Sequence, residues 1–150
     1  MSSIRLSHEI RASTREVFDL AGNFKNYPQF FQGPEKIHST TARHRVGTRL
    51  KMDWRLAGVS LPVELETTEV IPEKKISGVF VSGLEGHFEW DFDPTEDTTW
   101  VTLSAEYKLP RGGPVQVVDR GAMDRDLCTS MQKTLAAMKR LLESDRAAAA

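Results

Sequence analysis

The stretch PVQVVDRGAMDRDLCTSMQKTLAAMKRLLE, residues 114–143, is the longest periodic segment of the chain. One set of its apolar positions follows steps of one, three, four, three and four residues, which places the set on one stripe along an α-helix. These positions are Leu127, Cys128, Met131, Leu135, Met138 and Leu142. Gly112 and Gly113 end the preceding segment, and Pro114 suits a first helical turn because its missing N–H has no intrahelical partner there. The sequence therefore predicts a helix of about 45 Å, which needs a broad apolar partner.

Length, charge and cysteine content limit the classes of protein that fit. The 150 residues suffice for one domain, which we assign to 1–146, with 147–150 as a tail. The formal charge of −1 provides no positive field to hold nucleic acid. No apolar run approaches the roughly 20 residues of a membrane span, and a single cysteine fits a reducing compartment. We therefore expect a soluble cytoplasmic protein without nucleic-acid partners or stable membrane insertion, and a homodimer stays open.

The first part of the chain predicts one strand and two short helices. Residues 4–10 alternate apolar and polar side chains, as in a half-buried strand. Ser13 and Glu16 have the spacing of a capping box, which predicts a helix that stops at Gly22. A second helical piece is expected over 23–32. It is anchored by a cluster of aromatic residues, namely Phe24, Tyr27, Phe30 and Phe31.

From residue 35 onward the apolar period is two, and turn residues follow at short intervals. This pattern predicts an antiparallel meander, with strands over 48–56, 60–70, 76–81, 87–93 and 101–109 and a weak, polar strand over 36–44. A twisted sheet of about seven strands with one apolar face must curl around its cover. Because the terminal helix is the only adequate cover, the sequence predicts an α+β fold with a cavity between sheet and helix.

This order of elements resembles the helix-grip fold of the START-like superfamily, which includes polyketide cyclase/dehydrase and lipid-transport proteins. The resemblance spans essentially the whole chain. It is clearest in SHEIRASTREVFDLAGNFKNYPQFF (residues 7–31), in HFEWDF (87–92) and in the Gly-Gly-Pro sequence of 112–114. Members of this superfamily bind lipids, quinones, hormones or polyketides, and some cyclise or aromatise them. The resemblance therefore implies a hydrophobic ligand, but it aligns no catalytic residue.

The candidate ligand-binding residues are large aromatic, methionine and polar side chains on the inward phases of the predicted elements. They are His8, Phe30, Phe31, Met52, Trp54, Phe88, Trp90, Tyr107, Met123, Leu127 and Met131. Flat and flexible side chains suit a planar or isoprenoid ligand, and they suit a plain core equally well. His8 and Tyr107 fit two roles: each could orient a ligand oxygen or exchange a proton with it, or be a hydrogen-bonded core residue.

No metal and no cofactor are expected. The side chains of His87, Glu89, Asp91 and Asp93 share one face of a strand, but neighbours on that face lie nearly 7 Å apart, so at most two could reach one ion. A solvated outer face is the better interpretation. His38 and His44 stand isolated in a polar stretch. Cys128 is interpreted as a small core residue of the long helix.

Three functions remain open. The first is binding, or transport, of a small hydrophobic ligand such as a lipid, quinone or polyketide without covalent chemistry. The second is a polyketide aromatase/cyclase that catalyses aldol closure and dehydration, and it ranks lower because the inward phases hold few acids and bases. The third is an interaction module with a vestigial pocket, which a cavity too small for any ligand would favour.

Overall fold

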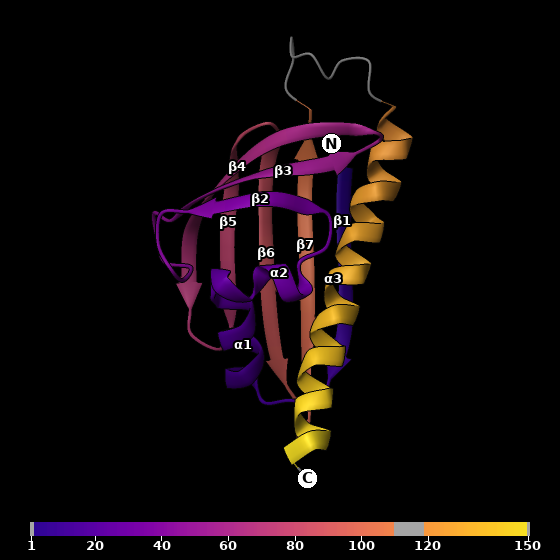
Figure 1. Ribbon diagram of the computed structural model, residues 1–150. Coiled ribbons are helices and arrows are strands. Elements are labelled where there is room, and N and C mark those ends of the chain that lie inside the picture. Colours follow the sequence, from indigo (N-terminus) through magenta and orange to yellow (C-terminus); the bar gives the residue numbers. More distant parts are fainter. Residues whose placement is uncertain (1, 110–118, 150) are drawn as a thin grey trace.

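The computed structural model describes residues 2–109 and 119–149, with side chains through residue 144. A seven-stranded antiparallel sheet carries the helices on one face (Figure 1). The elements in chain order are β1 (Ser2–Ile10), α1 (Thr14–Gly22), the 3₁₀ helix η1 (Phe24–Asn26), α2 (Tyr27–Phe30), β2 (Pro34–Ser39), β3 (Arg49–Leu56), β4 (Val59–Ile71), β5 (Lys75–Ser82), β6 (Glu85–Pro94), β7 (Thr99–Lys108) and α3 (Arg120–Ala149).

The strand order is β1-β7-β6-β5-β4-β3-β2, so β2 to β7 form the predicted meander and the first strand pairs with the last. Alternation fixes the faces: β3 buries Leu50, Met52, Trp54 and Leu56 and turns its polar residues outward. Figure 1 shows β3 and β4 bending across one end of the sheet toward the start of α3. The sheet is therefore curved, and its concave face is the apolar one.

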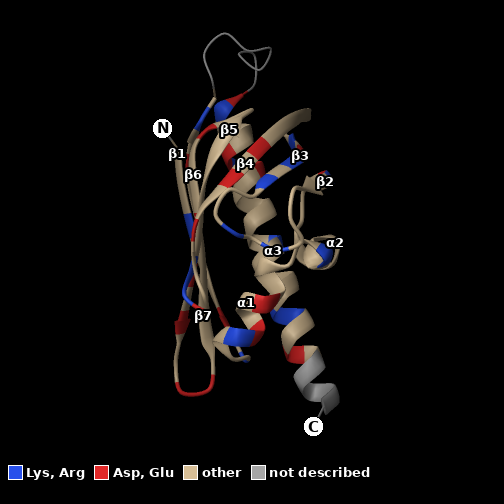
Figure 2. Cartoon of the chain, turned by 90° about the vertical axis from the view of Figure 1, so that its left-hand side faces the viewer, with Lys and Arg blue, Asp and Glu red and all other residues tan. Residues whose placement is uncertain are grey.

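The long helix α3 lies along this concave face (Figure 2). Its predicted stripe is buried at Leu127, Met131, Leu135 and Met138. Asp126 of α3 accepts a hydrogen bond from the backbone N–H of Ala57 at 2.7 Å, which ties the helix to the turn between β3 and β4. This arrangement confirms the predicted helix-grip architecture. The predicted capping box at the start of α1 is also present, with both of its hydrogen bonds formed.

Some boundaries differ from the prediction. The described part of α3 begins at Arg120 and continues to Ala149, beyond residue 143, while the predicted start at Pro114 lies outside the described residues. Cys128 is half-buried at the margin of the stripe rather than enclosed in the core. The strand predicted over 36–44 was wrong in its bounds, because β2 ends at Ser39 and the chain then turns back as a loop.

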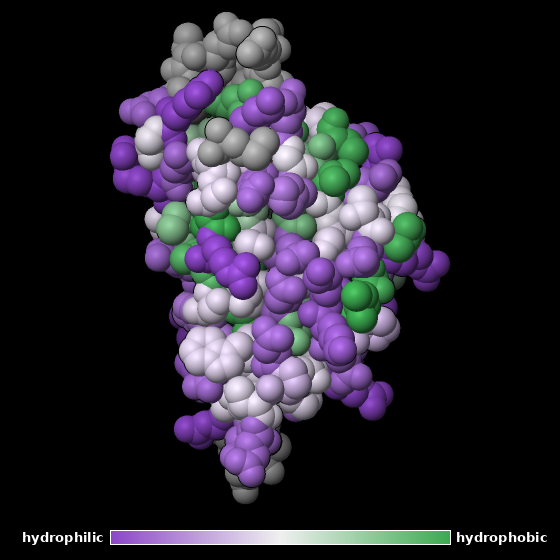
Figure 3. All heavy atoms as spheres, turned by 180° about the vertical axis from the view of Figure 1, so that it is seen from behind, coloured by the Kyte–Doolittle hydropathy of each residue, from purple (hydrophilic) through white to green (hydrophobic). Residues whose placement is uncertain are grey.

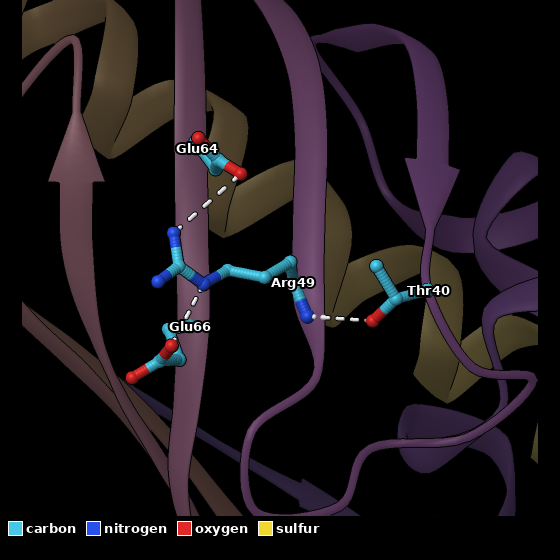
Figure 4. A network of polar contacts seen from close by, with 4 residues as sticks. All are labelled: Thr40, Arg49, Glu64 and Glu66. Atoms are coloured by element: carbon cyan, nitrogen blue, oxygen red, sulfur yellow. Dashed lines mark hydrogen bonds and ion pairs between the residues drawn. The ribbon is translucent and has the colours of Figure 1, made fainter.

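The convex face of the sheet is mostly polar, with separate hydrophobic groups between the polar ones, as Figure 3 shows from behind. Arg49 of β3 forms ion pairs with two glutamates of β4, at 3.7 Å to Glu64 and 2.7 Å to Glu66 (Figure 4). Lys75 of β5 similarly pairs with Glu89 of β6 at 3.3 Å. Among the outward residues of β6, His87 and Asp93 are exposed whereas Glu89 and Asp91 are half-buried, so the predicted outer face is only partly solvated.

Candidate functional site

A cavity lies between the concave face of the sheet and α3. Its walls come from α2 and the segment after it, from the loop over 40–48, from β3 to β7, and from α3. The lining residues are Tyr27, Phe31, His44, Leu50, Trp54, Leu65, Phe80, Phe88, Trp90, Leu103, Ser104, Ala105, Leu127, Ser130, Met131 and Thr134. The room left for water-sized molecules is about 40 Å³, while all space between the lining atoms, open mouth included, is about 570 Å³.

Aromatic rings form much of the wall. Phe31 stacks on Tyr27 with ring centroids 4.9 Å apart, and it meets Trp54 edge-on at 5.9 Å. On the opposite strands, Phe80 and Phe88 lie 6.2 Å apart. Such contacts hold the rings in defined orientations. The cavity therefore presents flat apolar surfaces.

A chain of hydrogen bonds runs from the cavity wall into the protein. The hydroxyl of Tyr27 lies 2.7 Å from Nε2 of His44, and Nδ1 of His44 lies 2.8 Å from the hydroxyl of Thr67. A neutral imidazole has one N–H and one acceptor nitrogen, so it donates to one hydroxyl and accepts from the other. The loop is fixed by two backbone hydrogen bonds, from Phe24 N–H to Ala42 O at 3.0 Å and from His44 N–H to Gly22 O at 2.9 Å.

Burial sets the charge state of this chain. Desolvation lowers the pKa of His44 to about 4 and raises the pKa of Tyr27 above its usual range. Both side chains are therefore neutral at pH 7. Because the other lining residues carry no Lys, Arg, Asp or Glu, the cavity wall as a whole is uncharged.

The other polar part of the wall joins α3 to the segment after α2. The hydroxyl of Ser130 donates to the carbonyl oxygen of Gln32, and the N–H of Gln32 donates to the hydroxyl of Thr134 at 3.0 Å. Trp54 of β3 approaches the same place. Its indole N–H is buried, and no acceptor among the described residues pairs with it.

The structure brings together some of the predicted binding residues in this cavity: Phe31, Trp54, Phe88, Trp90, Leu127 and Met131. Phe30 and Met52 are buried in the core and do not line this cavity. His8 faces an open groove between β1 and the second half of α3. Tyr107 and Met123 line a separate small pocket near the start of α3, where the Tyr107 hydroxyl donates to the carboxylate of Asp124. A ligand role for any of these residues stays a prediction.

Sequence reasoning did not assign several lining residues to the site. Tyr27 was identified only as part of an aromatic cluster. Ser130 and Thr134 are four residues apart beside Met131, so the helical stripe could have found them. His44 offered no such signal: the expectation of an isolated residue in a polar stretch was wrong, since its side chain is buried against Phe24, with ring centroids 4.4 Å apart.

Within residues 2–109 and 119–144, no group of three or more His, Cys, Asp or Glu side chains is placed to hold a metal ion. None of the described helices combines the length and the apolar character that crossing a membrane requires.

A curved antiparallel sheet that grips a terminal helix around an uncharged, aromatic cavity defines a helix-grip protein. The model of one family, polyketide cyclase/dehydrase and lipid transport, matches residues 1–143. The chain therefore belongs to that family. A search of curated proteins gave no match.

Solved structures from several bacteria share the fold. TTHA0849 from Thermus thermophilus is 17% identical, with a TM-score of 0.79 over 96% of this chain and 99% of its own. The Zhui aromatase/cyclase from Streptomyces sp. R1128 is 13% identical, with a TM-score of 0.79 over 95% and 93%. A START superfamily protein from Mycobacterium smegmatis is 16% identical, with a TM-score of 0.71 over 95% and 97%. Identities this low show the fold alone.

Proposed function

We propose that the protein binds a small hydrophobic molecule, such as a lipid, quinone or polyketide, between the sheet and α3 and releases it unchanged. The observation that carries this proposal is the cavity itself, whose wall is apolar, uncharged and built from both the sheet and the helix. Apolar burial stabilises such a complex by roughly 25 cal/mol per Å². Membership of a family of cyclases and lipid-transport proteins supports the same function.

Binding requires the cavity to widen. Its room of about 40 Å³ is far below the roughly 300–1,000 Å³ of most ligand pockets. Two lining residues suit such a change: Phe31 is only half-buried, and Met131 has a flexible, adaptable side chain. We therefore expect the side chains of Phe31 and Met131 to move aside when a ligand enters, while the hydrogen bonds between Gln32 and α3 stay formed.

The test is mass spectrometry of organic molecules that co-purify with the native protein, repeated on tryptophan variants. Trp54→Ala and Trp90→Ala each remove a large part of the wall and should lower the retained amount at least several-fold, because each deletes apolar contact area. Both variants should still unfold cooperatively. Trp100→Ala is the control, since Trp100 lies on β7 with 43% of its surface exposed and does not line the cavity.

Two results would count against this function. Unchanged retention in both cavity variants would contradict the assigned lining. If nothing co-purifies and no apolar probe binds, the cavity is vestigial and the interaction module becomes the better hypothesis.

Aldol closure and dehydration of a poly-ketone chain is the second candidate, favoured by the pairing of Tyr27 with His44 in the cavity wall. A phenol can donate a hydrogen bond to a ketone oxygen, and the imidazole behind it can accept or return a proton. Tyr27→Phe should then abolish turnover of a poly-ketone substrate. His8→Ala and Tyr107→Phe should leave turnover unchanged, because neither residue lines the cavity. Loss of turnover in those two variants instead would indicate that the reaction takes place outside this cavity.

A further inference from the structure

Trp54 carries a buried hydrogen-bond donor that has no acceptor among the described residues. Among the buried side-chain nitrogens of the described residues, Nε1 of Trp54 is the one without a partner. Buried N–H groups in native proteins almost always have an acceptor. We propose that this N–H binds an acceptor oxygen of the ligand, which is an uncharged, mostly apolar molecule with a carbonyl or ether oxygen. This inference rests on the binding function proposed above and adds the class of ligand.

The N–H lies where Trp54, Ser130 and Gly33 meet. A Cβ atom placed on Gly33 would come within 2.8 Å of Nε1 of Trp54 and 2.6 Å of the Ser130 hydroxyl. Gly33 has a φ of 107°, which side chains rarely adopt. The absence of a side chain at this residue keeps the space beside the donor clear. Trp54 and Ser130 both line the cavity, so a ligand there can approach this point.

The neighbouring polar groups are already engaged. Tyr27 is hydrogen-bonded to His44, and the Ser130 hydroxyl donates to the carbonyl oxygen of Gln32. The Thr134 hydroxyl donates to the carbonyl oxygen of Ser130 at 2.8 Å. A ligand oxygen therefore gains most from the indole N–H, because binding there breaks none of these hydrogen bonds.

The wall also selects against charge. A carboxylate or phosphate placed in the cavity would lose its hydration, and no lining residue offers a compensating cation. A neutral ketone or ether loses far less and recovers one hydrogen bond at Trp54. The geometry thus favours neutral carbonyl compounds over fatty acids and phosphorylated molecules.

The test compares 1-indanone with indane, which differ by one carbonyl group. Affinities for both probes are measured by calorimetry on the wild-type protein, on Trp54→Phe and on Phe88→Leu. Trp54→Phe should lower the indanone-to-indane affinity ratio about fivefold to tenfold, because one hydrogen bond is lost while shape effects cancel. Phe88→Leu should weaken both probes and leave the ratio unchanged, since Phe88 lines the cavity without a donor.

A spectroscopic readout supports the same comparison. In the wild-type protein, the indole N–H resonance of Trp54 should move downfield with indanone and not with indane, and this readout decides the question if Trp54→Phe fails to fold. Indane-1-carboxylate should bind at least about tenfold more weakly than indanone. An unchanged ratio, an unshifted resonance or equal binding of the carboxylate would overturn the inference while leaving hydrophobic binding intact. Failure of both neutral probes to bind would overturn the proposed function as well.

Discussion

On its concave face, β4 presents Thr67 to the buried hydrogen-bond chain of His44 and Tyr27, whereas on its convex face the adjacent Glu66 and nearby Glu64 pair with Arg49. The first group is neutral and enclosed, and the second is charged and solvated. Losing a hydrogen bond in a buried site is costly, because water cannot replace the lost partner of the polar group. An exposed ion pair exchanges its partner for water at little cost.

Each face also contains a group whose pKa shift makes the stability of the protein depend on pH, and the two dependences have opposite signs. Burial lowers the pKa of His44 to about 4, so the folded protein binds a proton less readily than the unfolded chain. On the outer face, partial burial and the neighbouring Glu89 raise the pKa of Asp91 to about 6, so the folded protein binds that proton more readily. Acidification therefore destabilises the protein through His44 and stabilises it slightly through Asp91.

The largest expected effect is the pH dependence from His44. Its stabilising contribution is complete above pH 6.5, the value for the unfolded chain, and is lost as pH falls toward the folded pKa of about 4. The free energy of unfolding should drop by about 3 kcal/mol across this window. Chemical denaturation of the wild type and of His44→Gln at pH 7 and pH 4 measures it, and the wild type should lose more stability than the variant by that amount.

The difference between the two proteins is the informative quantity, because carboxylates titrate in both. An imidazole pKa measured directly by NMR should agree with the result. If His44→Gln loses as much stability on acidification as the wild type, His44 is not the group that titrates.

A smaller effect is expected from Thr67→Val, which keeps the shape of the side chain and removes its hydroxyl. Nδ1 of His44 then lacks its partner in a buried site, which should cost about 1–3 kcal/mol. Thr68→Val is the matched control, because Thr68 is exposed on the opposite face of the same strand and should change stability by less than about 0.5 kcal/mol. Equal losses in the two variants would mean that the buried chain of hydrogen bonds contributes nothing specific.

Local patterns predicted the fold because they follow from the backbone itself. A period of two assigns residues such as Trp54 to one face of a strand wherever the strand pairs, and steps of three and four assign Leu127 and Met131 to one stripe of α3. The apolar, concave layer could therefore be derived from the sequence. The capping box of Ser13 and Glu16 was predictable for the same reason, since its hydrogen bonds join residues three positions apart.

The cavity lining was only partly predictable. Periodicity shows which face of a strand or helix a residue lies on, but it does not show whether the residue lies beside the cavity or elsewhere on that face. Tyr107 and Met123 point inward as predicted, but they line a different pocket near the start of α3. Which inward residues surround unfilled space depends on the curvature of the whole sheet. His44 shows a stronger limit: its loop has no periodicity, and its burial depends on hydrogen bonds to the distant residues Gly22 and Thr67.

The smallest expected effect, from Asp91→Asn, tests the outer face. Above pH 6 the Asp91 carboxylate is charged beside Glu89 and partly buried, so replacing it with a neutral amide should stabilise the protein at pH 8 by less than about 1 kcal/mol, given its partial exposure to solvent. At pH 4 the folded protein already holds Asp91 protonated, and the gain should nearly vanish. Denaturation curves at the two pH values measure the difference. In a Glu89→Gln background the gain at pH 8 should shrink, because the neighbouring charge is absent. A loss of stability at pH 8 would show instead that attraction to Lys75 dominates at the Asp91 carboxylate, and Asp91 would then not oppose His44 in the response to acid.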